Sequence, residues 1–220
     1  MKRTLAIATA GLAAFVPTAA ATHQPNHQPG APGNLTIDAT PDTVRFGRAV
    51  TLSGKLAGAN NATRPVTIEH DPFPVDTFTE LGTTTTNATG DWSFVHDSPA
   101  VNTRYRARSG GSESQIVTVG VRPAISLRLS DRTPDVGERV RFFGRLCPEH
   151  DGTRIAIQRR FGQNDWRTVR RTTLKDIDGS ACSRYSRRVP VRRDGAYRVR
   201  FRGDADHVAG NSRVRRVNVG

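Results

Sequence analysis

The chain has 220 residues, which corresponds to one or two domains, and a formal net charge of +13. Its apolar fraction, about 43% when Gly is counted in place of Tyr, lies near the globular average and excludes wholesale disorder. No apolar run approaches the roughly 20 residues of a membrane-spanning helix. With 20 Gly, 13 Pro and few aromatic residues, the composition favours two small β domains over one large α/β enzyme.

The first 21 residues have the pattern of a secretory signal peptide. Lys2 and Arg3 form a short basic segment, an apolar stretch follows at 5–16, and the small residues at 19–21 predict cleavage after Ala21. Residues 22–34 are rich in Pro, Gly and His without apolar periodicity, which indicates a flexible spacer. We therefore expect a secreted, extracellular protein, either released or associated with the cell envelope.

From residue 35 onward, apolar and polar residues alternate, which is the period of a half-buried strand. Strands are predicted in domain 35–121 near 35–39, 44–57, 65–70, 77–86, 91–96, 103–108 and 115–121. Strands are predicted in domain 122–220 near 124–130, 135–146, 153–160, 165–174, 183–189, 195–202 and 212–219. About seven short strands in each domain predict an all-β protein of two tandem sandwiches.

The two domains are copies of one pattern. Five positions that recur ninety residues apart are Gly47 and Gly137, Val50 and Val140, Leu52 and Phe142, Gly54 and Gly144, and Leu56 and Leu146. Val66 and Ile68 match Ile155 and Ile157 at an offset of 89. A repeat with such stable offsets predicts the same strand topology in both copies.

The repeated pattern resembles the bacterial immunoglobulin-like domains of secreted proteins from high-GC Gram-positive bacteria. The resemblance rests on the glycine-containing motifs at 47–56 and 137–146, on Asp-Gly-Ala-Tyr at 194–197, and on the segment from Tyr197 to Asp204. It implies immunoglobulin-like sandwiches, but no particular activity, because such domains serve as spacers, adhesins and carbohydrate-binding accessories. Neither copy has the Cys-Trp-Cys spacing of antibody domains, so antibody-like binding is not implied.

Cys147 and Cys182 are the only cysteines, and an oxidising compartment favours a disulfide between them. They lack the further ligands of a zinc site and do not form a CxxC redox pair. Closing this loop is expected to stabilise the fold by roughly 4 kcal/mol.

Charge is distributed unequally between the two copies. Residues 22–121 carry 7 basic and 9 acidic side chains, whereas residues 122–220 carry 24 basic and 11 acidic ones. If the aromatic face of 197–201 is core, the alternating arginines lie on an outer sheet face. The candidate polyanion-binding residues are Arg139, Arg141, Arg145, Arg198, Arg200 and Arg202. Guanidinium groups match phosphate and carboxylate geometry, but the charge pattern alone favours a solvated face that is partly neutralised by the eleven acidic residues of the same domain.

Large apolar side chains at the inward positions of the strands are expected in the two cores. Those predicted to be buried are Leu52, Leu56, Trp92, Phe94 and Tyr105 in the first domain, and Phe142, Trp166, Tyr197, Val199 and Phe201 in the second. Truncating Tyr197 is therefore expected to destabilise the second domain.

No catalytic motif stands out, so we predict no catalytic residues, no cofactor and no metal ligands. Asp204, Asp206 and His207 could hold a cation, but a turn explains the same residues. The favoured function is an exported, non-enzymatic binding or spacer module whose second domain contacts an anionic envelope polymer or a membrane surface. A purely structural protein without a ligand and an enzyme with an unrecognised site remain as alternatives. Nucleic acid is not expected as a natural partner, because the chain is exported and lacks a row of stacking aromatics.

Overall fold

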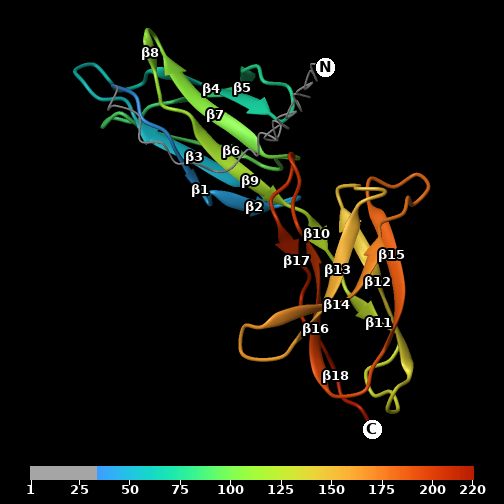
Figure 1. Ribbon diagram of the computed structural model, residues 1–220. Coiled ribbons are helices and arrows are strands. Elements are labelled where there is room, and N and C mark those ends of the chain that lie inside the picture. The colour runs from blue at the N-terminus through green and yellow to red at the C-terminus, as the bar shows by residue number, and fades with distance from the viewer. Residues whose placement is uncertain (1–33) are drawn as a thin grey trace, which may run out of the picture.

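The computed structural model describes residues 34–220, and this part of the chain is built from strands (Figure 1). The predicted signal peptide and the spacer up to residue 33 lie outside the described residues. Within residues 34–220, no helix is long and apolar enough to cross a membrane. The strands form two sandwiches that follow one another along the molecule.

The first sandwich packs a three-stranded sheet, in the order β1-β3-β6, against a second sheet in the order β2-β9-β7-β4-β5. Its strands are β1 (Asp38–Thr40), β2 (Thr43–Arg45), β3 (Val50–Lys55), β4 (Pro65–Pro72), β5 (Thr79–Thr85), β6 (Asp91–His96), β7 (Thr103–Ser109), β8 (Ser112–Glu113) and β9 (Val117–Arg122). Strand β2 pairs in parallel with β9, and the other neighbours are antiparallel.

The second sandwich repeats this arrangement. Its strands are β10 (Ala124–Ile125), β11 (Arg128–Leu129), β12 (Arg139–Cys147), β13 (Arg154–Arg160), β14 (Trp166–Thr173), β15 (Ser183–Pro190), β16 (Gly195–Phe201), β17 (Gly210–Asn211) and β18 (Arg215–Val217). One sheet has β12 between β15 and the pair β10 and β11, and the other runs β14-β13-β16 with β17 and β18 beside β16. The predicted fold class is confirmed for residues 34–220, which are all-β and form two tandem immunoglobulin-like sandwiches.

The prediction of one long strand at 44–57 was wrong in its boundaries. The backbone N–H of Arg48 donates to the carbonyl of Arg45 at 2.9 Å, and Gly47 has a φ of 78°. This turn separates β2 from β3, so the two strands join different sheets. A two-residue alternation identifies extended chain, but it cannot show where one strand ends and a new strand begins in the other sheet.

The repeated glycines have a structural reason. A Cβ added to Gly54 would lie 1.9 Å from the carbonyl oxygen of Thr36, and one added to Gly144 would lie 2.2 Å from that of Ser126. In both copies the first edge segment therefore crosses so closely that only glycine fits. This close approach accounts for one of the most regular features of the repeat.

Each sandwich has its own hydrophobic core, and eight of the ten predicted core residues are buried. Trp166 and Phe94 are exceptions, since both are only half-buried. Trp166 begins the edge strand β14 and lies over Arg198 on the outside of the sheet. Phe94 lies against Gly82, where β6 and β5 meet at the open edge of the sandwich. Trp166 therefore follows the alternation of core residues without reaching the core, whereas Phe94 packs against the edge of the first core.

The disulfide between Cys147 and Cys182 is present, with a Cα–Cα distance of 4.4 Å. It joins the end of β12 to the residue before β15, and these two strands also pair with each other. The prediction of this disulfide is confirmed.

The two sandwiches touch through a loop of the second one, between β16 and β17. Asn102 of the first sandwich donates its backbone N–H to the carbonyl of Asp206 at 2.8 Å, and its side-chain amide donates to that of Ala205 at 3.2 Å. The backbone N–H of Val208 donates to the carbonyl of Val121 at 2.9 Å. Direct hydrogen bonds thus connect the two sandwiches.

Candidate polyanion-binding surface

The arginines on β7 of the first sandwich are neutralised by carboxylates. Arg106 contacts Glu69 at 2.5 Å and Glu113 at 3.1 Å, and Arg108 contacts the same two residues at 3.5 Å. Arg104 forms ion pairs with Asp71 and Asp76. Burial alone would lower the pKa of Arg104, but hydrogen bonds to these two carboxylates raise it. Little free positive charge is left on this face.

The corresponding strand of the second sandwich, β16, carries arginines without carboxylate partners. Gln158 lies opposite Arg198 in the same way that Glu69 lies opposite Arg106. The Arg198 Nε donates to the Gln158 side-chain oxygen at 2.9 Å, so a neutral amide stands in place of the carboxylate. Burial and the nearby charge of Arg200 lower the pKa of Arg198. The positive charge on this strand is hydrogen-bonded but not cancelled.

Trp166 gives this outer face an aromatic surface. The guanidinium carbon of Arg198 lies 4.3 Å from the centre of the Trp166 ring, which is a cation–π arrangement. Arg198 and Arg200 are half-buried and Arg202, just beyond the end of β16, is exposed. Their alternation with the buried Tyr197, Val199 and Phe201 places all three on the outer face.

A second group of arginines lines a groove on the opposite sheet. This groove has a volume of about 630 Å³. Its arginines are Arg128 on β11, Arg141 and Arg145 on β12, and Arg184 on β15; we call these four the groove arginines. The guanidinium of Arg141 lies 4.4 Å from the centre of the Phe143 ring, which also lines the groove.

The groove arginines have no acidic partner within the described residues. In residues 122–220 the one arginine with a carboxylate within 4.0 Å is Arg167, which contacts Asp165 at 2.8 Å. Arg184 donates to a backbone carbonyl, that of Asp176, at 3.1 Å. The acidic residues of the second sandwich therefore do not neutralise the groove, although 11 of them are present.

The six candidate arginines from the sequence fall on two different sheets. Arg141 and Arg145 lie together in the groove, and Arg139 is exposed at the start of the same strand, opposite Pro190. Arg198, Arg200 and Arg202 belong to the other sheet, so the two groups face away from each other across the core. They form two separate basic surfaces and not one.

Sequence reasoning missed Arg128 and Arg184, which complete the groove. Arg184 lies directly opposite Arg145 in the ladder between β12 and β15, and Arg128 lies opposite Phe143. These two pairs join residues that are 39 and 15 positions apart in the sequence. The alternation of Arg184 with Ser183 and Tyr185, both buried, was the signal that could have placed it on the outer face.

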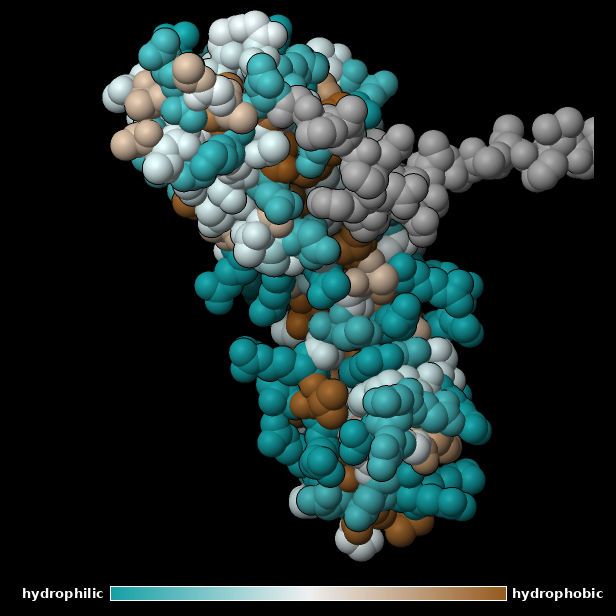
Figure 2. Space-filling model, turned by 90° about the vertical axis from the view of Figure 1, so that its left-hand side faces the viewer, coloured by the Kyte–Doolittle hydropathy of each residue, from teal (hydrophilic) through white to brown (hydrophobic). Residues whose placement is uncertain are grey.

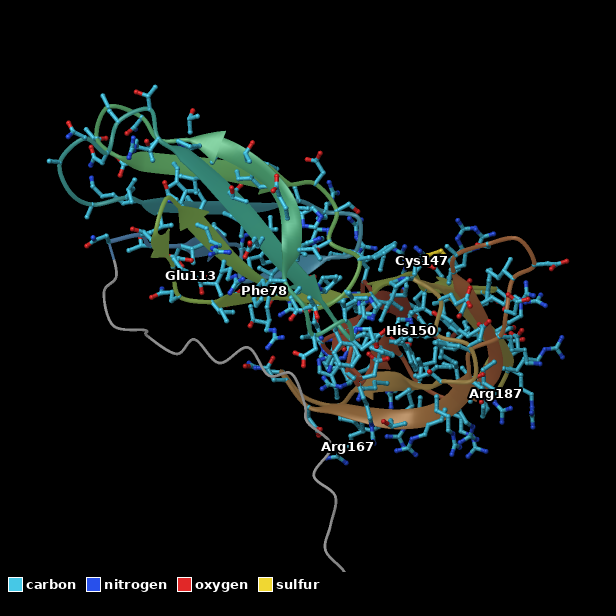
Figure 3. All side chains as sticks on the ribbon, turned by 90° about the horizontal axis from the view of Figure 1, so that it is seen from above. Phe78, Glu113, Cys147, His150, Arg167 and Arg187 are labelled. Carbon is cyan, nitrogen blue, oxygen red and sulfur yellow. A yellow bond between two sulfur atoms is a disulfide. The ribbon has the colours of Figure 1, made fainter. Side chains whose placement is uncertain are left out.

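The second sandwich also has the more uniformly hydrophilic surface in the view of Figure 2. Figure 2 shows hydrophilic side chains covering most of the visible face of the second sandwich, whereas the first sandwich shows a more mixed surface. In Figure 3, Arg167 and Arg187 point outward from the second sandwich, away from its core. Exposed guanidinium groups beside an aromatic ring can bind phosphate or carboxylate groups with two hydrogen bonds each.

No family model matches the chain, and no curated protein matches it. Among solved structures, the chain is similar to the D0-D1 domain of intimin, with 10% sequence identity and a TM-score of 0.30. The match covers 84% of this chain and 97% of the intimin chain. The tandem sandwich fold described above is established by the strand pairing itself.

Proposed function

We propose that the protein is an exported, non-enzymatic module whose second sandwich binds an anionic polymer of the cell envelope. The observation that carries this proposal is the difference between the two copies. The arginines of β7 face carboxylates, whereas those of β16 and of the groove have none. A fold that needed its arginines only for stability would be expected to neutralise them alike in both copies.

The disulfide and the predicted signal peptide support export, because disulfides persist in oxidising compartments. The resemblance to secreted domains of high-GC Gram-positive bacteria favours a polymer of the cell wall with repeated phosphate or carboxylate groups. The first sandwich, with its arginines already paired, serves in this proposal as a spacer. A purely structural protein without its own ligand is the alternative.

The test is binding of the mature chain, residues 22–220, to isolated cell wall, measured by co-sedimentation. Binding is expected at ~0.05 M salt and is expected to fall at ~0.3 M, because the Debye length decreases from ~14 to ~6 Å. Anionic lipid vesicles form a second arm. Stronger binding to vesicles than to wall would replace the polymer with a membrane surface.

Matched variants distinguish binding in the groove from non-specific attraction by the overall positive charge of the protein. Replacing Arg141, Arg145 and Arg184 with Gln removes three charges from the groove and is expected to weaken binding at least tenfold. Replacing Arg45, Arg48 and Arg64 with Gln removes three charges from exposed positions of the first sandwich and is expected to change little.

Replacing the three groove residues with Lys is the finer test, because Lys keeps the charge but not the planar fork. If wall binding fell equally in the groove variant and in the control variant, a specific site in the groove would be contradicted. Absence of wall binding at low salt would favour the structural alternative.

A further inference from the structure

Four potential metal ligands converge where the second sandwich meets the first. His150 lies in the turn between β12 and β13, and Asp204, Asp206 and His207 lie in the loop between β16 and β17. One ligand atom from each of the four lies within 4.8 Å of all the others. Sequence reasoning considered Asp204, Asp206 and His207 for a cation but favoured a turn, and it did not include His150, which is more than fifty residues away. Figure 3 shows His150 on the side of the second sandwich that faces the first.

The hydrogen bonds of both histidines fix which nitrogen is free. Nδ1 of His150 lies 2.9 Å from the carbonyl of Pro148, and Nε2 of His207 lies 2.9 Å from the carbonyl of Ala100. Because a carbonyl can only accept, these two nitrogens carry the protons in the neutral rings. The lone pairs therefore belong to Nε2 of His150 and Nδ1 of His207, the two atoms that face the carboxylates. A backbone carbonyl that holds the other ring nitrogen is the usual support of a metal-binding histidine.

These two nitrogens are buried and lack a well-aligned hydrogen bond among the described residues. The side chains of His150 and His207 are only 5% and 2% exposed. Leaving a buried polar atom without a partner costs free energy, so such an atom in a folded protein points to a missing ligand.

The carboxylates add negative charge that no Arg or Lys balances. Asp204 and Asp206 have ion-pair contacts only with the two histidines among the described residues, in a domain with 24 basic side chains. One oxygen of Asp204 accepts a hydrogen bond from the backbone N–H of His207 at 2.9 Å, which leaves the other directed at His150. Asp204 is 34% exposed, so an ion can reach the cluster from solvent.

We propose that His150, Asp204, Asp206 and His207 bind a divalent transition-metal ion of the zinc class. Two imidazoles and two carboxylates suit Zn²⁺, whereas Ca²⁺ and Mg²⁺ require oxygen ligands throughout. Ligands bound at ~2.0–2.1 Å to a tetrahedral ion lie about 3.3–3.4 Å from one another. The contacts of His150 with Asp204 at 3.2 Å, and of His207 with Asp206 and Asp204 at 3.5 and 3.9 Å, are already close to this spacing.

The site would stiffen the junction between the two sandwiches. His207 donates to Ala100 of the first sandwich, and the carbonyl of Asp206 accepts from Asn102. A metal that holds this loop against His150 therefore also holds the hydrogen bonds between the sandwiches in place.

The test is calorimetric titration of the mature chain with ZnCl₂ after treatment with a chelator. His23 and His27 of the spacer are replaced with Gln, and no histidine tag is present. One Zn²⁺ per chain is expected, with Ca²⁺ and Mg²⁺ giving no comparable heat. Loss of a support residue typically weakens metal binding by ~10–100-fold, so loss of a ligand is expected to weaken it at least ~100-fold.

The informative variants are Asp206→Asn and His150→Gln, with Asp178→Asn as the matched control. Asp178 is an exposed carboxylate of the second sandwich that belongs to no group of potential metal ligands among the described residues. Thermal unfolding adds a second readout, since Zn²⁺ is expected to raise the midpoint of the parent chain and the control but not of Asp206→Asn. Asp206 is 41% exposed, so this variant is expected to fold.

Co²⁺ in place of Zn²⁺ is expected to give the intense visible absorption of a tetrahedral ion. No Zn²⁺ binding by the parent chain, unchanged binding by Asp206→Asn and His150→Gln, or a preference for Ca²⁺ would each overturn the proposal.

Discussion

Removing the disulfide is expected to destabilise the second sandwich selectively. Cys147 and Cys182 are 35 residues apart, and the closed loop contains all of β13 and β14. Chain entropy predicts a loss of about 4 kcal/mol in the free energy of unfolding when both are replaced with Ala. For a domain of about 100 residues, each kcal/mol moves the unfolding midpoint by about 4–8 °C, so the midpoint should fall by roughly 15–30 °C.

The assay is differential scanning calorimetry of the mature chain and of the double Cys→Ala variant. The unfolding of the first sandwich is the internal control, because its core does not contain the disulfide. Binding to cell wall should also weaken near the melting of the second sandwich, since Ile177 and Arg184, on either side of Cys182, line the groove. A midpoint that changes by less than a few degrees would refute the reasoning that this loop is open in the unfolded chain.

Two further predictions concern single residues. Gly144→Ala should lower the free energy of unfolding of the second sandwich by about 1–3 kcal/mol, because the new Cβ would lie 2.2 Å from the carbonyl of Ser126. Gly162→Ala should change the free energy of unfolding little, since the nearest neighbour of its new Cβ would be 3.7 Å away. Urea unfolding of the two variants measures both values. The pKa of His96, whose Nδ1 lies 2.8 Å from the Tyr105 hydroxyl, is lowered by burial. The unfolded chain therefore binds more protons, and the first sandwich should lose stability as pH falls below about 6.5, with a shallower dependence in His96→Gln. A steeper dependence in that variant would contradict this.

The fold was predictable because the sequence shows both the alternation of apolar and polar residues in strands and a nearly constant spacing between matching residues of the two copies. A one-residue error in register would have turned Tyr197 outward and Arg198 inward, and the structure shows the predicted register. The cysteine pair was predictable because only two cysteines exist.

The groove was not predictable, because it depends on which strands become neighbours. Arg145 and Arg184 meet only through the pairing of β12 with β15, and periodicity within one strand carries no information on that pairing. The same limit hid the histidine and aspartate cluster, since His150 reaches Asp204 from a different turn. Trp166 shows a different limit of sequence reasoning. Its place in the apolar alternation predicts burial, but it lies on the outer face of an edge strand.

Exchanging Glu69 and Gln158 tests most directly whether the free charge of the second sandwich affects wall binding without affecting stability. Glu and Gln have nearly the same shape, and each lies opposite an arginine at the same place in its copy. Packing therefore does not require the amide at position 158. Gln158→Glu should convert the 2.9 Å hydrogen bond to Arg198 into an ion pair like that of Arg106 with Glu69.

We expect Gln158→Glu to change the unfolding midpoint little, because Gln158 is buried and the cost of desolvating the new carboxylate offsets much of its attraction to Arg198. Its binding to cell wall should decrease if the β16 face takes part, and remain unchanged if the groove alone binds. Glu69→Gln is the reciprocal variant, which leaves Glu113 as the remaining carboxylate partner of Arg106 and Arg108 and should add weak wall binding on the first sandwich. If neither exchange alters binding while the groove variant does, the neutral amide at 158 has no role in recognition, and the polymer contacts only the sheet that contains β12.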